Sequence, residues 1–585
     1  MRFKGTVLMT LAFIGIVLYY FLLEIPGERK RKEEKDLSEK VLAFKAEDID
    51  EFSLVRKDQT AVVRRTGKDG WEIVQPVQAK ADGSAAESIL DRLQNAAFSR
   101  VVEENPADLA AYGLKQPSLQ ISLKWKGGGA SLAVGDGSPI GHSLYVKRGG
   151  QNRVLLSPIE KRELDKSLFE LRDKTILSYP VTEVVSAEIQ RAGAPALRFD
   201  KKNAAWSVTG KSTSKGDAGE IENFLNSVRS ARISEFIDED PEDLSAYGLA
   251  SPSIRLTVTA GENGPAQTLL IGSKKEDGNY YAKVSAAKNV FAAGASLVDT
   301  LSRNELDFPD KSLLDFAEKD AAEIELVENG KTIHLLRDKA DPKTWRIDKP
   351  IEAEADPATA SSLLFDLKDA RVAAFIESDA KNLKAYGLDA PQKRFSLLSA
   401  GNKSAGFTLG NQTNDGQSYF AAREDGPSVF VLSVETVNKI FRTLHDLRNR
   451  KLLRLKSEEA AKISIQYPGR TFELEKRDED WNLSKPEETA VKPFVPKDIL
   501  WTLSGLEFES IVDPPLPPKE SGLDRPAAQI TVSGKQDKPL AKLTVGNQTG
   551  DKSLRYAQVE GNPALYRIKE RFMNEIPKDL EKLKN

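Results

Sequence analysis

The chain has 585 residues, with 85 Lys plus Arg against 88 Asp plus Glu and a formal net charge of −3. A chain of this length exceeds what one hydrophobic core supports, so several domains are expected. The near balance of charge gives no field strong enough to argue for nucleic acid as a partner, and we predict none. The sequence contains no cysteine, and this favours a compartment outside the cytoplasm, where stray thiols would be oxidised.

The amino-terminal residues 5–23 carry no charge and are rich in Val, Leu, Ile, Phe and Tyr. As a helix, these 19 residues would extend about 28 Å, close to the hydrocarbon thickness of a bilayer. We therefore predict a transmembrane helix within an anchor of residues 1–24, kept as an uncleaved signal anchor. A cleaved signal peptide is the alternative, but the stretch runs into Tyr19-Tyr20-Phe21-Leu22-Leu23-Glu24 without a small-residue cleavage site. A buried core helix is the third interpretation.

The next segment, residues 25–40, mixes both charges and predicts a solvated linker. Basic residues on both sides of the apolar segment leave the positive-inside count undecided, and long domains translocate largely regardless of charge. The lack of cysteine then favours a single-pass protein of the inner (cytoplasmic) membrane with most of its chain periplasmic or otherwise extracytoplasmic. Some bacterial proteins simply lack cysteine, which leaves the opposite orientation open.

A pair of landmarks returns four times along the rest of the chain: a tryptophan and, 41 or 42 residues later, a glycine followed by leucine and, four positions on, proline. The landmarks are Trp71, Gly113 and Pro117; Trp206, Gly248 and Pro252; Trp345, Gly387 and Pro391; and Trp481, Gly522 and Pro526. Steps of 135, 139 and 135 residues separate the glycines. Units of this size can bury their own cores. We predict repeat units at residues 41–177, 178–314, 315–453 and 454–585.

The second unit shows the predicted elements most clearly. Alternating polarity indicates strands at 185–189, 196–199 and 205–208, and apolar residues at helical spacing indicate a helix over 220–229. After a turn at Gly248, strands follow at 254–258, 268–271, 280–284 and 289–291, and a helix closes the unit. The fold class is therefore α+β, with four tandem βββα-turn-ββββα units and mainly antiparallel sheets behind the membrane helix.

The recurring residues have structural explanations. Gly248 suits the left-handed position that ends a short helix, and Pro252 blocks its continuation. Tyr247, with its counterparts Tyr112 and Tyr386, is expected to pack with its hydroxyl satisfied rather than to bind a ligand. A second set of glycines is expected in hairpin turns, since none opens a helix as a phosphate loop would: Gly135, Gly272, Gly410 and Gly546.

No catalytic constellation stands out. The three histidines, His142, His334 and His445, fall in three different units, and neither paired ligands nor a Walker or Gly-x-Ser-x-Gly motif is present. We predict no catalytic, cofactor-binding or metal-binding residues, no cofactor and no enzymatic activity. A glycan-directed activity is the residual alternative, because a carboxylate pair cannot be picked out of so charged a sequence.

The tryptophans, the Ala-Tyr-Gly-Leu turns, the Leu-Val-Gly hairpin and the Leu-Arg-Asp-Lys helix end give the chain a family resemblance. From about residue 40 to 585 it resembles tandem copies of the bacterial domain of unknown function 4340. The fourth unit departs by having Glu520-Ser521 in place of Ala-Tyr. The resemblance implies a membrane-anchored companion of ABC-type transporters related to those of gliding motility, with permease or ATPase subunits as partners.

The leading functional hypothesis is a non-enzymatic accessory or scaffold protein of a transport or envelope complex, attached to the membrane through residues 5–23. Two alternatives remain. In one, the repeats serve only as a spacer, and in the other, the protein binds or acts on an envelope polysaccharide. Burial of the four repeat tryptophans would favour packing over sugar contact. Trp125 and Trp501 have no counterparts and are candidates for contacts specific to one unit, although Trp501, among Ile499, Leu500 and Leu503, is expected in the core.

Overall fold

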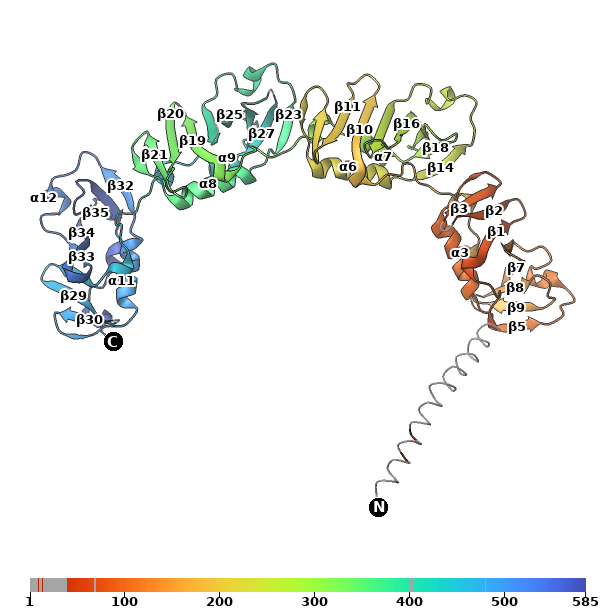
Figure 1. Ribbon diagram of the computed structural model, residues 1–585, viewed down its shortest axis with the longest axis horizontal. Coiled ribbons are helices and arrows are strands. Elements are labelled where there is room, and N and C mark those ends of the chain that lie inside the picture. Colours follow the sequence, from red (N-terminus) through yellow and green to blue (C-terminus); the bar gives the residue numbers. More distant parts are fainter. Residues whose placement is uncertain are drawn as a thin grey trace. The chain divides into compact units, whose positions relative to one another are not determined.

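A computed structural model describes residues 39–584, except 68–69, 140, 142, 400–403, 427 and 479, together with Met9 and Phe13. The chain divides into two compact units, one ending at Asp310 and the other beginning at Lys311. Each unit holds two repeats, and each repeat is built around one nine-stranded sheet (Figure 1). All pairings within the sheets are antiparallel, as the registers of neighbouring strands show.

The first repeat sets the pattern of the sheet. Strands β1 to β4 lie on one side of it and β6 to β9 on the other, with β1 paired to β6 at the centre and β5 at the far edge. In sheet order the strands are β4 (Ala79–Lys80), β3 (Gly70–Gln75), β2 (Thr60–Thr66), β1 (Ile49–Val55), β6 (Leu119–Trp125), β7 (Gly128–Gly137), β8 (Leu144–Arg148), β9 (Val154–Ser157) and β5 (Arg100–Glu103).

The other sheets repeat this order. The second contains β13 (Thr213–Lys215), β12 (Ala205–Thr209), β11 (Leu197–Lys202), β10 (Val184–Arg191), β15 (Ile254–Ala260), β16 (Ala266–Lys274), β17 (Tyr280–Val284), β18 (Val290–Ala293) and β14 (Ile233–Asp238). The third contains β22 (Ala353–Glu354), β21 (Trp345–Lys349), β20 (Lys331–Arg337), β19 (Ala321–Glu328), β24 (Lys393–Ser399), β25 (Ser404–Gln412), β26 (Ser418–Arg423), β27 (Val429–Ser433) and β23 (Ala374–Glu377). The fourth contains β31 (Thr489–Ala490), β30 (Asp480–Lys485), β29 (Arg470–Arg477), β28 (Lys462–Tyr467), β33 (Ala528–Ser533), β34 (Pro539–Gln548), β35 (Leu554–Val559), β36 (Leu565–Lys569) and β32 (Phe508–Val512).

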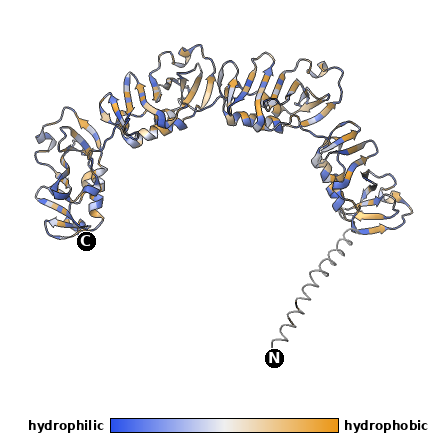
Figure 2. Cartoon of the chain, viewed as in Figure 1, coloured by the Kyte–Doolittle hydropathy of each residue, from blue (hydrophilic) through white to orange (hydrophobic). Residues whose placement is uncertain are grey.

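One long helix per repeat connects the two edges of each sheet. These helices are α3 (Gly83–Asn95), α6 (Ala218–Ser230), α8 (Pro357–Asp369) and α11 (Val495–Ser504). The first three begin behind an aspartate, Asp82, Asp217 or Asp356, whose carboxylate accepts a hydrogen bond from a backbone N–H of the first turn. Each buries residues at helical spacing against the sheet. Burial alternates along central strands such as β1 and β6, and both hydrophobic and hydrophilic residues occur on the strands (Figure 2).

Short helices complete each repeat. The repeated turn forms the 3-10 helices η3 (Leu109–Tyr112), η5 (Ser245–Tyr247) and η8 (Leu383–Tyr386) and, in the fourth repeat, α12 (Pro518–Ser521). Further short helices follow the last strands of each repeat. They are α4 (Lys161–Leu164) and α5 (Leu168–Leu171) in the first repeat, α7 (Ala295–Leu301) in the second, α9 (Val434–Ile440) and α10 (Leu444–Leu447) in the third, and α13 (Phe572–Glu575) in the fourth.

Every repeat receives and releases the chain through backbone bridges at the two ends of its long helix. An incoming segment pairs with the residue that follows the helix region, in the bridges Lys40 to Ala97, Thr175 to Arg232, Ser312 to Arg371 and Lys451 to Glu507. An outgoing segment pairs with the residue that precedes the helix, in the bridges Arg172 to Ala81, Pro309 to Gly216, Arg448 to Ala355 and Lys584 to Val491. Both segments therefore extend the sheet edges that the helix connects.

The predicted fold class is corrected in two respects. Each repeat has nine strands instead of seven, because short strands flank the long helix on both sides, as β4 and β5 flank α3. The predicted transmembrane helix is not part of the described architecture: within residues 39–584 and the two isolated positions before them, no helix combines the length and the apolar character needed to cross a bilayer. The predicted span itself, residues 5–23, lies outside the described residues apart from Met9 and Phe13.

Candidate interaction surfaces

The repeat tryptophans lie inside the domains. The side chains of Trp71, Trp206 and Trp345 are buried, at 3%, 2% and 3% exposure, and Trp481 is partly buried against the core of the fourth repeat. Trp71 shows the surroundings: its Nε1 donates to a carboxylate oxygen of Glu87 at 2.8 Å, and the Arg65 guanidinium lies 4.2 Å from its ring centroid. Lys201 over Trp206 and Arg337 over Trp345 repeat this cation contact. These surroundings indicate packing, not sugar binding.

The turn glycines end their short helices in the left-handed conformation. The φ angles are +68° at Gly113 and Gly248, +70° at Gly387 and +74° at Gly522, which glycine adopts at little cost. The prolines Pro117, Pro252, Pro391 and Pro526 follow in the bend before the next strand. All eight positions thus form a device that connects the edge strand after the long helix to the central strand of the sheet.

The turn tyrosines donate their hydroxyl hydrogen bonds to the edge strand. Tyr112 donates to Glu103 at 2.8 Å and Tyr386 to Glu377 at 2.9 Å, while Tyr247 donates to Asp238 at 2.9 Å. The hydrogen bond to Glu103 raises the pKa of Tyr112 above its ordinary value. A ring from a neighbouring strand packs against each tyrosine, such as Tyr145 at 5.0 Å from Tyr112. The tyrosines are therefore engaged inside their own repeats, as expected.

The second set of glycines lies within strands and not in hairpin turns, which corrects the prediction. Gly135, Gly272, Gly410 and Gly546 belong to β7, β16, β25 and β34. A Cβ atom at each would lie only 2.0–2.1 Å from the backbone carbonyl oxygen of the residue before the turn glycine. These positions are glycine because the turn packs directly on the strand backbone. A phosphate loop is not formed.

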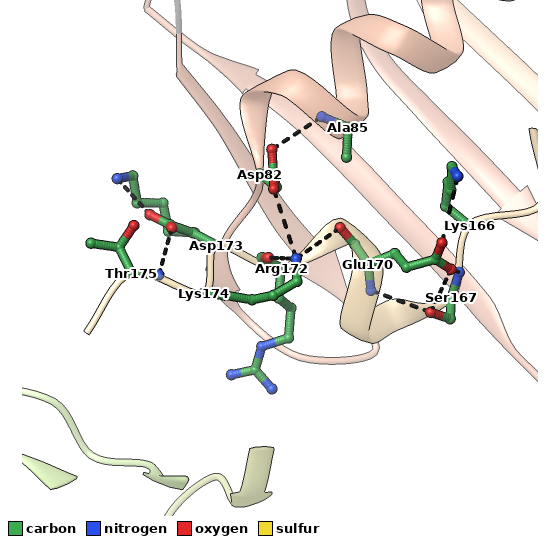
Figure 3. Close-up of polar contacts among 10 residues, drawn as sticks. Asp82, Ala85, Lys166, Ser167, Glu170, Arg172, Asp173, Lys174 and Thr175 are labelled. Carbon is green, nitrogen blue, oxygen red and sulfur yellow. Dashed lines mark hydrogen bonds and ion pairs between the residues drawn. The ribbon is translucent and has the colours of Figure 1, made fainter. Parts of the chain in front are cut away.

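The junction of the first and second repeats concentrates polar contacts within the first unit (Figure 3). The Arg172 side chain, 5% exposed, forms a two-pronged ion pair with Glu239, and its guanidinium lies 3.4 Å from the ring centroid of Phe236. Arg172 belongs to the outgoing segment of the first repeat, whereas both partners belong to the second. Phe169 contacts the same Phe236 ring edge-on at 6.0 Å. The contact joins the two repeats.

A cavity of about 580 Å³ at this junction is lined by Lys80, Asp82, Asp173, Lys174 and Arg232, among others. Its charges compensate each other: Lys80 pairs with Asp173 at 2.7 Å and Lys174 with Asp82 at 3.7 Å. Burial alone would raise the pKa of Asp173, but hydrogen bonds from Lys80 and from the Thr175 hydroxyl and backbone N–H leave that pKa below its ordinary value. Because these lysines already have carboxylate partners, the cavity is a structural junction rather than an anion site.

Three aromatic side chains stand on the outer faces of long helices in the second unit. Phe365 of α8 is 63% exposed, and Phe494 and Trp501 at α11 are 58% and 77% exposed. The sequence-based placement of Trp501 in the core is wrong, because Val495, Ile499 and Leu503 occupy the buried face of α11. Trp125, the other candidate, lies at the end of β6 and packs partly buried against the core of the first repeat.

The histidines contribute no shared centre. His142 lies outside the described residues, and His334 of β20 lies 2.7 Å from Asp348 and 3.3 Å from Glu323. His445 belongs to α10. Among the residues that the structure describes, no group of three His, Cys, Asp or Glu side chains is placed to hold a metal ion.

A family model covers most of the chain. The model described as "Domain of unknown function (DUF4340)" matches residues 71–239, 206–344, 345–526 and 497–585. The chain belongs to this family. The four matches show that DUF4340 is repeated along the chain, in agreement with the four sheets.

Other comparisons add little to the DUF4340 assignment. No curated protein matches the chain. One solved structure, of a protein from Eubacterium rectale ATCC 33656 described as a DNA polymerase III beta subunit, shares 6% identity with it. The match covers 68% of this chain and 94% of that one, with a TM-score of 0.12. That score is too low to support any conclusion about fold or function.

Proposed function

We propose that this DUF4340 protein is a non-enzymatic accessory or scaffold component of an ABC-type transport or envelope complex, with most of its chain outside the cytoplasm. The observation that supports the proposal is the structural role of the repeated residues. Turn glycines in all four repeats, and buried tryptophans and turn tyrosines in the first three, are engaged in packing within their own repeat. What differs between copies is the exposed surface, which suits a chain that presents several contact faces to partners.

Two sequence features support a location at the cytoplasmic membrane. The apolar residues 5–23 would associate the chain with the bilayer, and the absence of cysteine suits an oxidising compartment. Permease or ATPase subunits of a transporter are the proposed partners, as the family resemblance implies. The four repeat tryptophans offer no support for the polysaccharide alternative, since three of them are buried and the fourth is half-buried.

In vivo crosslinking tests this proposal. The full chain is crosslinked in its native membrane, and the copurifying proteins are identified by mass spectrometry. Recovery of an ABC-type permease or ATPase, lost when an uncrosslinked control is processed in parallel, is the expected result. Recovery of neither subunit from membranes that still contain the transporter would refute the accessory role. Fractionation of the same cells checks the location independently of the partner.

A further inference from the structure

Helix α11 displays two aromatic side chains on one solvent-facing stripe. Phe494 and Trp501 are 58% and 77% exposed. Phe494 precedes the first residue of the helix, but its φ of −84° and ψ of −26° are helical and its carbonyl accepts a hydrogen bond from the Asp498 backbone N–H at 2.9 Å. Helical spacing therefore applies to both residues. Seven positions place them on the same face, about 10.5 Å apart along the axis.

The fold does not require this pair. The buried residues Leu90, Leu225, Leu364 and Leu500 occupy the same position of the four long helices. The following residue is Asp91 in α3, Asn226 in α6, Phe365 in α8 and Trp501 in α11. At the position of Phe494 the other helices have Ser84, Gly219 and Ala358. Of the four long helices, α11 is thus the one with an aromatic residue at both positions.

The space between the two rings is polar. Lys497 and Asp498 are exposed and lie three and four positions after Phe494, so they share the stripe with the aromatics. One cation and one carboxylate cancel in charge while offering several hydrogen-bond donors and acceptors. The stripe therefore alternates an apolar platform, a neutral polar centre and a second apolar platform.

This pattern fits an uncharged sugar chain better than a protein or a lipid surface. A stable protein interface of standard size needs about 800 Å² on each partner with a contiguous apolar centre, whereas here charged side chains separate the rings. A helix that lies on a bilayer has a continuous apolar face and an excess of cations, and α11 has neither between its aromatics. The axial advance of about 10.5 Å between the two backbone positions is close to the length of two pyranose rings in an extended β-1,4-linked glycan.

We propose that Phe494 and Trp501 form a binding platform for an extended, uncharged β-1,4-linked glycan. One sugar ring stacks its C–H face on each aromatic, and the ring between them exchanges hydrogen bonds with Lys497 and Asp498. Binding makes and breaks no covalent bond. The site is independent of the transporter partner proposed above, because it rests on the exposed face of one helix.

Isothermal titration calorimetry with the full chain and the hexamer of β-1,4-linked N-acetylglucosamine tests the platform. We expect the hexamer to bind, and Trp501→Ala and Phe494→Ala each to weaken binding about tenfold. Phe365→Ala is the matched control, since it removes an equally exposed aromatic that has no aromatic partner two turns away, and it should bind as the wild type does. Trp501→Tyr should retain most of the affinity, because a ring remains. The dimer of the same sugar should bind much more weakly than the hexamer, since it cannot reach both rings.

Two results would overturn the proposal. The first is that the hexamer fails to bind the wild-type chain, or binds Trp501→Ala with unchanged affinity. The other combines two observations: the wild-type chain sediments with phosphatidylglycerol vesicles and Trp501→Ala does not, while the hexamer gives no heat of binding. That combination would assign the stripe to a lipid surface. Both aromatics are solvent-exposed, so the thermal unfolding of the variants should match that of the wild type and exclude misfolding as the cause.

Discussion

Substitution of Gly272 by alanine tests the packing of the repeated turn on the sheet. The added Cβ would lie 2.1 Å from the carbonyl oxygen of Tyr247 and 3.1 Å from Cγ of Leu249. Ordinary contacts begin near 3.4 Å, and the nearer atom belongs to the backbone, so no side-chain rotation relieves the overlap. The turn and the strand must separate, and we expect a cost of about 2–3 kcal/mol.

Hydrogen exchange followed by mass spectrometry can localise this loss in the full chain, where global unfolding of several repeats would not be two-state. Amides of β15 and β16 should exchange about thirtyfold faster or more in Gly272→Ala. Gly294→Ala is the control: its φ is −65° and the nearest atom to the new Cβ is 3.8 Å away. Equal protection in Gly272→Ala and Gly294→Ala would refute the steric argument.

Three further predictions concern the first unit. A double-mutant cycle of Arg172→Met and Glu239→Gln should give a coupling of about 1–3 kcal/mol in the exchange of the second-repeat edge strand, and additive effects would contradict a direct pair. Because the folded-state pKa of Asp173 is lowered, its contribution to stability is present above the unfolded pKa of about 4 and is lost as the pH falls through the folded pKa. Asp173→Asn should therefore abolish this acid dependence of the junction, measured by hydrogen exchange between pH 5 and 2.5. An unchanged pH profile would show that another group is responsible. Leu225→Ala should destabilise the second repeat by about 2–5 kcal/mol, whereas Asn226→Ala, at an exposed position, should cost about 0.5 kcal/mol or less. The two variants are compared by urea unfolding of the full chain, in which peptides of the second repeat report its unfolding.

Periodicity explains which parts of the fold could be predicted from sequence. Ile221, Phe224, Leu225 and Val228 lie at helical spacing, and all four are buried in α6. The strands β4, β22 and β31 have two residues each, too few to show an alternating pattern. They pair with β3, β21 and β30, and the residue that follows each of them bridges to an outgoing segment some ninety residues later in the chain.

The surface and the close contacts were harder to predict for different reasons. Gly272 faces a carbonyl 25 positions earlier, and such tertiary proximity leaves no local signal. Trp501 did have a local signal: Val495 and Ile499 lie at helical spacing on the buried face, and that spacing places Trp501 on another face of the helix. The continuous apolar run of Ile499, Leu500 and Trp501 obscured that spacing.

The bridges at the two ends of each long helix have an evolutionary consequence. In each repeat the incoming and the outgoing segment pair beside the same helix, and only two residues lie between the paired Arg172 and the paired Thr175. A copy of one repeat inserted in frame at such a point would find its own pairing sites within itself. The array can therefore lengthen or shorten by tandem duplication or loss of whole domains, without any change to the residues that fold each one.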